Sequence, residues 1–554
     1  MNIKKLVTTL LLSCAIIFSL IILMPRGSSY CAQEQCGVFF WGANEHDGIW
    51  HLAVSNTLLS NIPFEMPNMS GSLIRGYNYL LDMIIALLAY TTKIDSSIWF
   101  FKIQPIVWVY VFIYSSYNFA ISYKKSNYFH IFLWFFLFFG SSFGYVLQLA
   151  NRGSIWGSSS ILSMQSLQNL LNPQFAWSLV TLLVFLTGLN LNKRKHKDYL
   201  WYGFLAAIAI SLKFYTGVVM SIMIGVDLII QFVTKKDDLK FFCIKSLLSA
   251  SLVLISVLIF YNPGASSQSP FILKALAPVN PIIEDKSLFY LPTWAERLYS
   301  YSGIKLFILE TLVLVIFILL NFGSRIFALF GLILKPKLSK PETENLIIIG
   351  AIISFLFSIL LVQRGVWWNT VQFLYVSLFL TSILAADGID KLFNKNKIWS
   401  RMFVFIILAL TIPSNLDVIH TFAKFPGSAY IPNEELIGLN FLKSQPQGIV
   451  LTPIFAHRPQ LGTVGTVGNS YDTAYVSAYT GKQSYLSDKI QLELTNIDYS
   501  ERLAQVNRND CKVLTEVDYA YEYLGNEYVN LYQNCGSQAK LIYKNSLINI
   551  YKID

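Results

Sequence analysis

The chain has 554 residues, of which 54% are hydrophobic and only 13% are charged. A soluble domain usually carries about 25% charged residues, so this composition excludes an ordinary soluble protein and indicates a chain that folds in a bilayer. The net charge of +10 comes from short clusters of lysine and arginine between apolar runs. No basic stripe with interleaved aromatic residues accompanies these clusters, so nucleic acid is not expected as a partner.

The first apolar stretch runs from Leu6 to Met24. It is longer than the core of a usual signal peptide, and no small-x-small cleavage site follows it, so we expect an uncleaved first transmembrane helix. Apolar runs of about 20 residues recur along the first three quarters of the chain, which is the length that crosses the hydrocarbon core as a helix. The eleven predicted spans are residues 5–24, 97–121, 127–148, 173–191, 199–213, 214–234, 241–261, 304–321, 345–363, 369–386 and 401–414.

One apolar segment, residues 73–92, is left out of that set. It carries Arg75 and Asp82, so it is either a span or an amphipathic helix that lies flat in the membrane interface. If it lies flat, every later cationic cluster falls on the same side of the membrane as Lys4 and Lys5. If it spans, those clusters fall on the opposite side. We therefore predict a flat helix, an inner N-terminus and an outer C-terminus. The clusters are Lys124/Lys125, residues 193–197, Lys235/Lys236/Lys240, Lys335/Lys337/Lys340 and residues 391–401.

In this topology, residues 322–334 form a cytoplasmic interfacial piece, and four of the six cysteines lie outside. The simplest pairing of the outer cysteines is Cys31–Cys36 with Cys511–Cys535, and a metal site built from Cys31, Cys36 and nearby histidines is the alternative. The predicted outer segments are residues 25–96, 149–172, 262–303, 364–368 and the tail after about residue 414.

The first outer segment contains a polar stretch, ANEHDGIWHLAVSN, that gathers Glu45, Asp47 and His51 close to the membrane surface. Asp47 and His51 are four residues apart and would share one face of a short helix. A carboxylate there could act as a general base on an acceptor hydroxyl, a role typically worth about 10²–10⁴ in rate. The structural alternative is an aspartate that caps a juxtamembrane helix, with His51 at the water interface.

Two further outer segments carry cations beside polar or aromatic side chains. Residues 149–172 contain no acid but offer Arg152 with many hydroxyls and amides, which suits sugar hydroxyls or a phosphate, or simply the polar face of an interfacial helix. Pro173 follows at a position typical of a first helical turn. Arg364 lies close to Trp367 and Trp368, which could stack on a sugar ring or anchor a span at the interface.

Lys213 interrupts the apolar stretch 199–234 where two spans must turn on the outer side. An ionisable residue at membrane depth costs about 3 kcal/mol on insertion scales, and this cost makes it a candidate functional residue. A lysine there could hold a lipid phosphate, or it could snorkel from a helix end into water.

The composition changes after the last span. A helix over 431–446 capped by Asn433, a buried strand in GIVLTPIF, a helix in DYSERLAQVNRN and a closing hairpin that turns at residues 544–546 together indicate a small α/β domain. We predict two domains, a transmembrane domain over 1–414 and an extracytoplasmic α/β domain over 415–554. The tail shows no Gly-rich phosphate loop, and a lid or an acceptor-recognition module is its expected role.

This architecture resembles the GT-C superfamily of polyprenyl-phosphate-sugar-dependent glycosyltransferases, notably the protein O-mannosyltransferase and aminoarabinose transferase branch. That branch has an Asp-Glu-x-x-Tyr motif in its first outer loop, to which Asp47-Gly48-Ile49-Trp50-His51 is similar in its first Asp and its four-residue step. Lys213, in SLKFYTG, is similar to the lysine that some relatives place near the carrier phosphate. Many relatives carry a second acid after the third span, and this chain has none there.

The resemblance implies an inverting membrane glycosyltransferase with its site on the outer face, in a bacterial cytoplasmic membrane. Asp47 would be the base, with Glu45 as the fallback. The phosphate of a polyprenyl-phosphate-linked sugar would be held by Lys213, with Arg152 or Arg364 as further candidates, and the acceptor, a glycan, lipid or protein, would lie against His51, Tyr77 and Tyr79. No cofactor is indicated, and a divalent metal stays an open alternative. The competing classes are a transporter or flippase for a lipid-linked sugar and a receptor with an outer ligand-binding tail.

Overall fold

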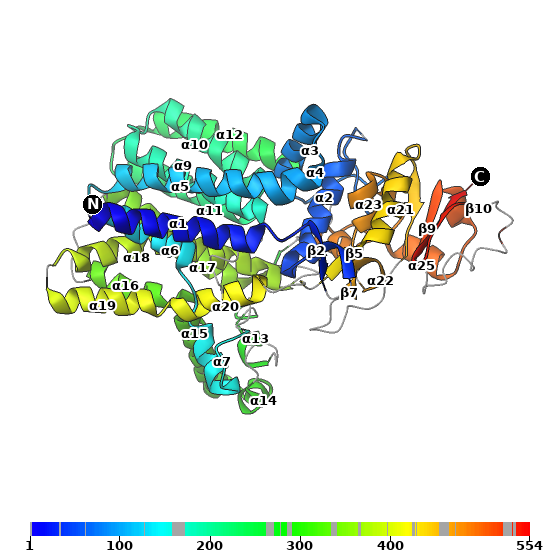
Figure 1. The fold of residues 1–554 in the computed structure, drawn as a ribbon. Coiled ribbons are helices and arrows are strands. Elements are labelled where there is room, and N and C mark those ends of the chain that lie inside the picture. Colours follow the sequence, from blue (N-terminus) through cyan, green and yellow to red (C-terminus); the bar gives the residue numbers. More distant parts are fainter. Residues whose placement is uncertain are drawn as a thin grey trace. The chain divides into compact units, whose positions relative to one another are not determined.

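The structure of the chain is a computed structural model in which two compact units are seen. The helical unit comprises Met1–Leu20, Val107–Tyr261 and Ser267–Thr421, and the mixed unit comprises Ile21–Ile106, Asn262–Ser266 and Phe422–Asp554. Long helices run side by side in the helical unit, and most strands belong to the mixed unit (Figure 1). All residues are described except 1–2, 33–34, 61, 127, 158–171, 262–270, 278, 285–290, 334–340, 364–366, 396, 424–426, 428, 454–464, 471, 524–534, 536–538 and 554.

Apolar helices build the helical unit. Across the described residues of the chain, nine helices are long and apolar enough to cross a membrane, and a bent pair makes a tenth. The chain is therefore a polytopic, mostly helical membrane protein, as its composition predicts. The main helices are α1 (Ile3–Leu23), α5 (Gln104–Tyr123), α6 (Phe129–Phe139), α7 (Gly144–Arg152), α9 (Pro173–Leu191), α10 (His196–Leu212), α11 (Phe214–Val233), α12 (Leu239–Tyr261), α15 (Gly303–Phe322), α16 (Ser324–Ile333), α17 (Pro341–Leu360), α18 (Gln372–Phe393), α19 (Ile398–Ala409) and α20 (Ile412–Phe422).

The bent pair, α6 and α7, corresponds to the single span predicted over 127–148. The two helices are bent by 44° at Gly140-Ser141-Ser142-Phe143, where the apolar run is interrupted. Polar groups freed by the break find partners on other helices, because Phe143 N–H donates to the carbonyl of Leu320 (2.7 Å) and Ser414 Oγ donates to that of Ser142 (2.7 Å). The span predicted over 199–213 coincides with α10, whose 17 residues rise about 26 Å, and this helix is not among the nine that are long and apolar enough to cross a membrane.

Close backbone approach holds neighbouring helices of this unit together. A Cβ added to Gly203 of α10 would lie 2.6 Å from the Cα of Ser249 in α12, so only glycine allows this crossing. At Pro173 the prediction of a first-turn proline is confirmed, since Asn172 Oδ1 accepts the backbone N–H of Phe175 (3.0 Å) and Pro173 follows the cap directly. Residues 322–334 include α16, in which the buried guanidinium of Arg325 donates to Ser382 Oγ of α18 (2.8 Å).

The relative direction of α1 and α6 tests the topology. Lys4 interacts electrostatically with His130, and the rings of Phe18 and Phe139 lie 5.4 Å apart, so the two helices run parallel. Only α5 then crosses between them, because a second crossing by residues 73–92 would make α1 and α6 antiparallel. The structure thus supports the prediction that 73–92 does not span. The helix within that segment, α3 (Leu80–Thr92), has 13 residues and rises about 20 Å, less than the roughly 30 Å of a hydrocarbon core.

Two sheets organise the mixed unit. The first has the strand order β1-β2-β5-β7, with β2 (Gln35–Phe40) antiparallel to β5 (Ala429–Pro432). The tail therefore shares a sheet with the first loop, and the apolar end of β2 is buried at this junction. The second sheet has the order β10-β11-β9-β6-β8. The remaining strands are β1 (Ser28–Ala32), β7 (Gly465–Thr466), β6 (Ile449–Leu451), β8 (Gln483–Ser484), β9 (Tyr519–Tyr523), β10 (Ala539–Lys544) and β11 (Ile548–Ile553).

Most local predictions for the tail are confirmed. The hairpin β10–β11 turns over residues 545–547, and α21 (Asn433–Ser444), β6 and α25 (Ser500–Asn507) lie within their predicted segments. The prediction that Asn433 caps this helix was wrong, because the extended Pro432 takes the N-cap position and Asn433 is the first helical residue. The other helices of the unit are α2 (Asp47–Thr57), α4 (Ser96–Ile98), α22 (Val467–Ser470), α23 (Tyr475–Thr480), α24 (Lys489–Leu494) and α26 (Lys512–Thr515).

Both predicted disulfides are present in the mixed unit. Cys31 pairs with Cys36 across the β1–β2 hairpin, and Cys511 pairs with Cys535. The alternative in which Cys31 and Cys36 bind a metal is therefore wrong.

Candidate active site

The acidic stretch of the first loop lies at the start of α2. A short 3₁₀ turn, Gly42–Glu45, precedes the helix, and Asp47 is its first residue. Apolar side chains such as Ile49 and Trp50 are fully buried and fix the helix in the unit. The carboxylate of Asp47 is 45% exposed and lies at the positive end of the helix dipole, which favours a negative charge.

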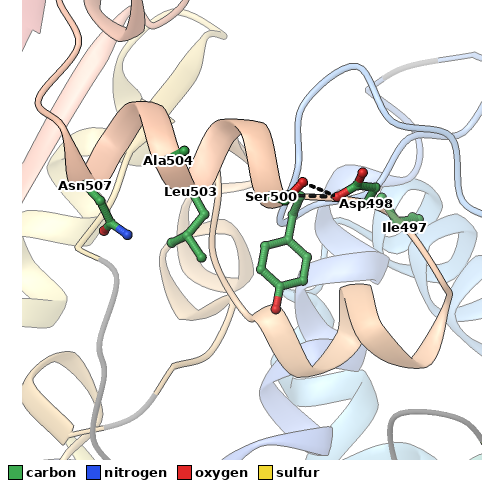
Figure 2. A pocket seen from close by; sticks show the side chains of 7 residues that line it. Ile497, Asp498, Ser500, Leu503, Ala504 and Asn507 are labelled. Atoms are coloured by element: carbon green, nitrogen blue, oxygen red, sulfur yellow. Dashed lines mark hydrogen bonds between the residues drawn. The ribbon is translucent and has the colours of Figure 1, made fainter.

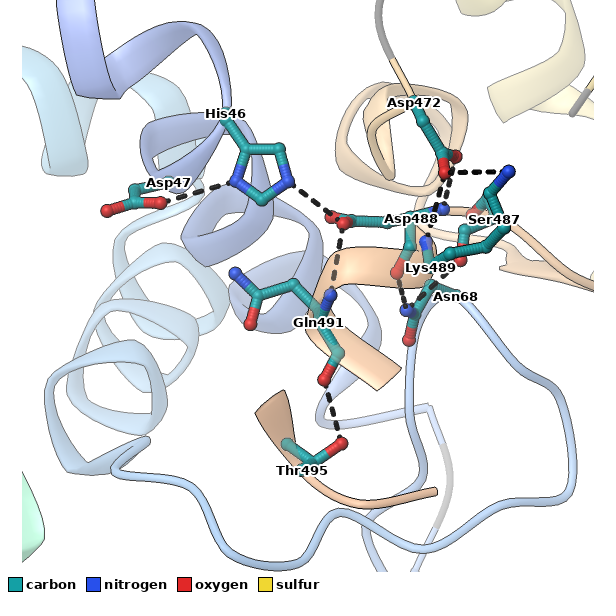
Figure 3. A network of polar contacts seen from close by, with 9 residues as sticks. All are labelled: His46, Asp47, Asn68, Asp472, Ser487, Asp488, Lys489, Gln491 and Thr495. Atoms are coloured by element: carbon teal, nitrogen blue, oxygen red, sulfur yellow. Dashed lines mark hydrogen bonds and ion pairs between the residues drawn. The ribbon is translucent and has the colours of Figure 1, made fainter. Parts of the chain in front are cut away.

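His46 joins this carboxylate to a second one. Its Nδ1 lies 3.3 Å from Asp47 Oδ1, and its Nε2 lies 3.0 Å from Asp488 Oδ1. Figure 3 shows the ring between the two carboxylates. Asp488 is fully buried, whereas the side chain of His46 is 22% exposed. Burial alone would lower the pKa of His46, but Asp488 and Asp47 together raise it well above 6.5. The two carboxylates therefore favour the protonated form of the imidazole.

Asp488 stands in an ordered turn just before α24. Its backbone is in the left-handed region, with φ at +47°, and its N–H donates to Asp472 Oδ1 (2.8 Å). The amide of Asn68 donates to the carbonyls of Ser487 (3.2 Å) and Asp488 (3.0 Å), which ties this turn to the first loop. Lys489 donates its own N–H to Asp472 Oδ2 (3.2 Å). Burial and Asp488 raise the pKa of Asp472.

A second histidine lies one helical turn along α2. His51 is buried, its Nδ1 lies 3.1 Å from Oδ2 of the fully buried Asp82 on α3, and its Nε2 lies 3.3 Å from the hydroxyl of Tyr77. The three groups form an Asp–His–Tyr series in which the imidazole can polarise the tyrosine hydroxyl. Tyr79 is also buried, and its ring packs edge-on against Phe64.

The cations predicted to bind phosphate belong to the helical unit. Lys213 separates α10 from α11 with extended backbone dihedrals (φ −158°, ψ 116°) and is 8% exposed. Nearby, Tyr215 Oη donates to Gln363 Oε1 (3.0 Å), which also accepts from Asn369 Nδ2 (2.8 Å). Arg152 is the exposed last residue of α7. Arg364 lies outside the described residues.

The structure therefore collects five of the predicted site residues in the mixed unit and adds partners that the sequence did not reveal. The five are Glu45, Asp47, His51, Tyr77 and Tyr79. Of the missed partners, Asp82 carried a signal, because a carboxylate in an apolar helix needs a partner. Asp488 carried none, since its contact with His46 joins residues 442 positions apart.

Within the described ranges, no group of three or more His, Cys, Asp or Glu side chains could hold a metal ion. A shallow depression of about 380 Å³ lies elsewhere on the mixed unit, along α25 and the turn before it (Figure 2). Its lining includes Asp498 and Tyr499 but none of the predicted site residues.

Comparison with solved structures identifies the fold. The oligosaccharyltransferase of Archaeoglobus fulgidus, in its complex with Zn and sulfate, superposes with a TM-score of 0.50 at 12% identity, covering 98% of this chain and 73% of that one. AglB from the same archaeon, in complex with an inhibitory peptide and a dolichol-phosphate, gives 0.48 at 12% identity, with 96% and 71% covered. No protein-family model and no curated protein match the sequence. At this identity the likeness establishes the GT-C fold and leaves the activity to be argued from the residues.

Proposed function

We propose that this GT-C-fold protein is an integral-membrane glycosyltransferase that moves a sugar from a polyprenyl phosphate to an acceptor hydroxyl. One observation carries the proposal: a partly exposed carboxylate, Asp47, stands at the N-terminus of α2 and lies 3.3 Å from the imidazole of His46. The predicted topology puts this site on the outer face of a bacterial cytoplasmic membrane.

Asp47 is the general base in this proposal. Its Oδ1 lies 3.3 Å from His46 Nδ1, and its carboxylate, which is 45% exposed, takes the proton of the acceptor hydroxyl. The adjacent cation favours the ionised carboxylate, which is the form a base needs. Glu45, at the end of the preceding turn, is the fallback base.

Lys213 supplies the positive charge for the donor phosphate. An ammonium 4 Å from a phosphate oxygen attracts it by about 4 kcal/mol at an effective dielectric of 20, before the cost of desolvation. Arg152 and Arg364 are the further candidates for this role. The donor enters from the bilayer, where its polyprenyl chain stays.

The acceptor lies against His51, Tyr77 and Tyr79. The acceptor oxygen attacks the anomeric carbon as Asp47 takes its proton, a bond forms between that oxygen and the carbon, and the bond to the phosphate oxygen breaks. The polyprenyl phosphate leaves with the bonding electrons. A single displacement inverts the anomeric configuration.

An assay in proteoliposomes tests this class of function. Purified protein is given a radiolabelled polyprenyl-phosphate sugar with glycan, lipid and peptide acceptors, and both product formation and movement of the donor between leaflets are followed. Label in an acceptor, together with stoichiometric release of polyprenyl phosphate, is the expected result. Movement of the intact donor without release of polyprenyl phosphate would instead identify a flippase.

A further inference from the structure

The turn that precedes α24 reaches the candidate base through one histidine. We propose that Asp488 is a positioning residue that acts through His46 to hold the carboxylate of Asp47 in the orientation that accepts the acceptor's proton. This inference rests on the proposed role of Asp47 as a base. It gives the C-terminal tail a direct part in the active site, in addition to any role in acceptor recognition.

Simultaneous hydrogen bonds from one imidazole to two ionised carboxylates require a protonated ring. His46 faces a carboxylate at each nitrogen, Asp488 at Nε2 (3.0 Å) and Asp47 at Nδ1 (3.3 Å). An ionised carboxylate only accepts hydrogen bonds, and both ring nitrogens carry a proton only in the imidazolium. The cation therefore donates to both acids at once, and loss of its proton removes one of the two contacts.

The two acids differ in how firmly they are held. The carboxylate of Asp488 is fully buried, whereas that of Asp47 is 45% exposed. Asp488 Oδ1 also accepts the backbone N–H of Gln491 at the start of α24 (3.4 Å), and among the described residues no donor forms a hydrogen bond with its Oδ2. His46 therefore supplies the positive charge beside this buried carboxylate. The buried Asp488 thus anchors the imidazole of His46, and the imidazole orients the exposed carboxylate of Asp47.

The backbone around Asp488 is arranged to present this side chain. The left-handed conformation at φ +47° is one that aspartate and asparagine tolerate better than most residues. Asp472 accepts two consecutive N–H groups of the turn, and Asn68 donates to two of its carbonyls (Figure 3). These contacts leave the carboxylate of Asp488 little freedom to turn away from the ring.

A pH dependence follows from this geometry. The charged groups that act on His46 are Asp47 and Asp488. Next to Asp488 in the turn, Lys489 Nζ lies 3.7 Å from Asp472 Oδ2. The two acids adjoining the ring raise the pKa of His46 well above 6.5, so transfer should decline on the alkaline side as the imidazolium loses its proton.

The variant Asp488→Asn tests the inference, because it keeps the shape, the left-handed backbone and the Oδ1 acceptor but removes the charge. The matched control is Asp498→Asn, which replaces an exposed aspartate of the same unit whose Oδ1 accepts the backbone N–H of Ser500. Histidine ¹³C NMR of the full chain in detergent measures the titration of His46, whose signal is assigned with His46→Gln. Transfer rates at saturating donor, measured across a range of pH, give the decline in activity on the alkaline side, which is called the alkaline limb below.

We expect Asp488→Asn to lower the pKa of His46 by about 1–3, to move the alkaline limb to lower pH by the same amount, and to reduce kcat about a hundredfold with little change in donor KM. Asp498→Asn should change none of these. A uniform loss of rate with an unmoved limb, or an unchanged His46 titration in an active enzyme, would overturn the inference. A wild type that transfers no sugar would overturn the proposed function, and the NMR titration would then still report on the contact between Asp488 and His46.

Discussion

Replacement of Glu435 by glutamine should stabilise the mixed unit, and more so as pH rises. Glu435 is fully buried in α21, and its Oε1 accepts the hydroxyl of Tyr521 (2.7 Å). Burial raises the pKa of this carboxyl from 4.5 to about 7, although hydrogen bonds from Tyr521 and Tyr475 act in the opposite direction. The site has no room to relax, since a Cβ on Gly468 would lie 2.5 Å from Glu435 Oε1.

The sign and the size of this pH effect follow from the linkage between proton binding and folding. Because the folded state holds the proton more tightly, the contribution of Glu435 to stability is fully present below pH 4.5 and is lost as pH rises to about 7. The difference between pKa values of 4.5 and about 7, at about 1.4 kcal/mol per unit, corresponds to roughly 3 kcal/mol above pH 7. Glu435→Gln keeps an acceptor for Tyr521 and has no charge to bury.

Paired melting temperatures in detergent at pH 5 and pH 8 measure this effect, because other titrating groups contribute equally to both proteins. We expect the variant and the wild type to melt within a few degrees of each other at pH 5. At pH 8 the variant should melt higher, by roughly 2–4 °C for each kcal/mol. An equal difference at both pH values, or a wild type that is the more stable protein at pH 8, would show that Glu435 is not buried at a cost in its ionised form.

Three further changes have defined outcomes. Lys213→Ala should raise the donor KM about 10–100-fold, because hydrogen bonds to charged groups contribute about 1.5–3 kcal/mol, whereas Lys213→Arg should retain most of the affinity. Equal donor KM values for Lys213→Ala and the wild type in steady-state assays would contradict a phosphate contact. Asp82→Ala should destabilise the protein by about 1–3 kcal/mol, because it leaves the buried Nδ1 of His51 without its acceptor, and thermal melting should show a smaller loss for Asp82→Asn. Paired replacement of Cys511 and Cys535 by serine should cost about 3 kcal/mol, because their bond closes a loop with a separation of 24 residues; an unchanged melting temperature would show that this loop is constrained by other contacts.

Hydropathy predicted the membrane helices well, because a span needs a long apolar run whatever its neighbours are. Local patterns also predicted the β10–β11 hairpin and the position of Pro173. The break between α6 and α7 was missed, because Gly140-Ser141-Ser142 is a weak interruption whose polar groups find partners on α15 and α20.

Long-range pairing could not be predicted from periodicity. The pairing of β2 with β5 and the contact between His46 and Asp488 each join the first loop to the tail, about four hundred residues further along the chain. The sequence did place Asp47, His51 and Tyr77 in one loop, and the structure shows which acid holds each histidine.

In the proposed reaction the carboxylate of Asp47 takes the acceptor's proton. The most direct test compares initial transfer rates of Asp47→Asn with those of Glu501→Gln, which alters an exposed acid in the first turn of α25 in the same unit. We predict that Asp47→Asn lowers transfer by at least about 10²–10⁴ while donor binding and melting temperature stay near wild type, and that Glu501→Gln is fully active. An Asp47→Asn enzyme that transfers sugar at the wild-type rate would show that Asp47 is not the base.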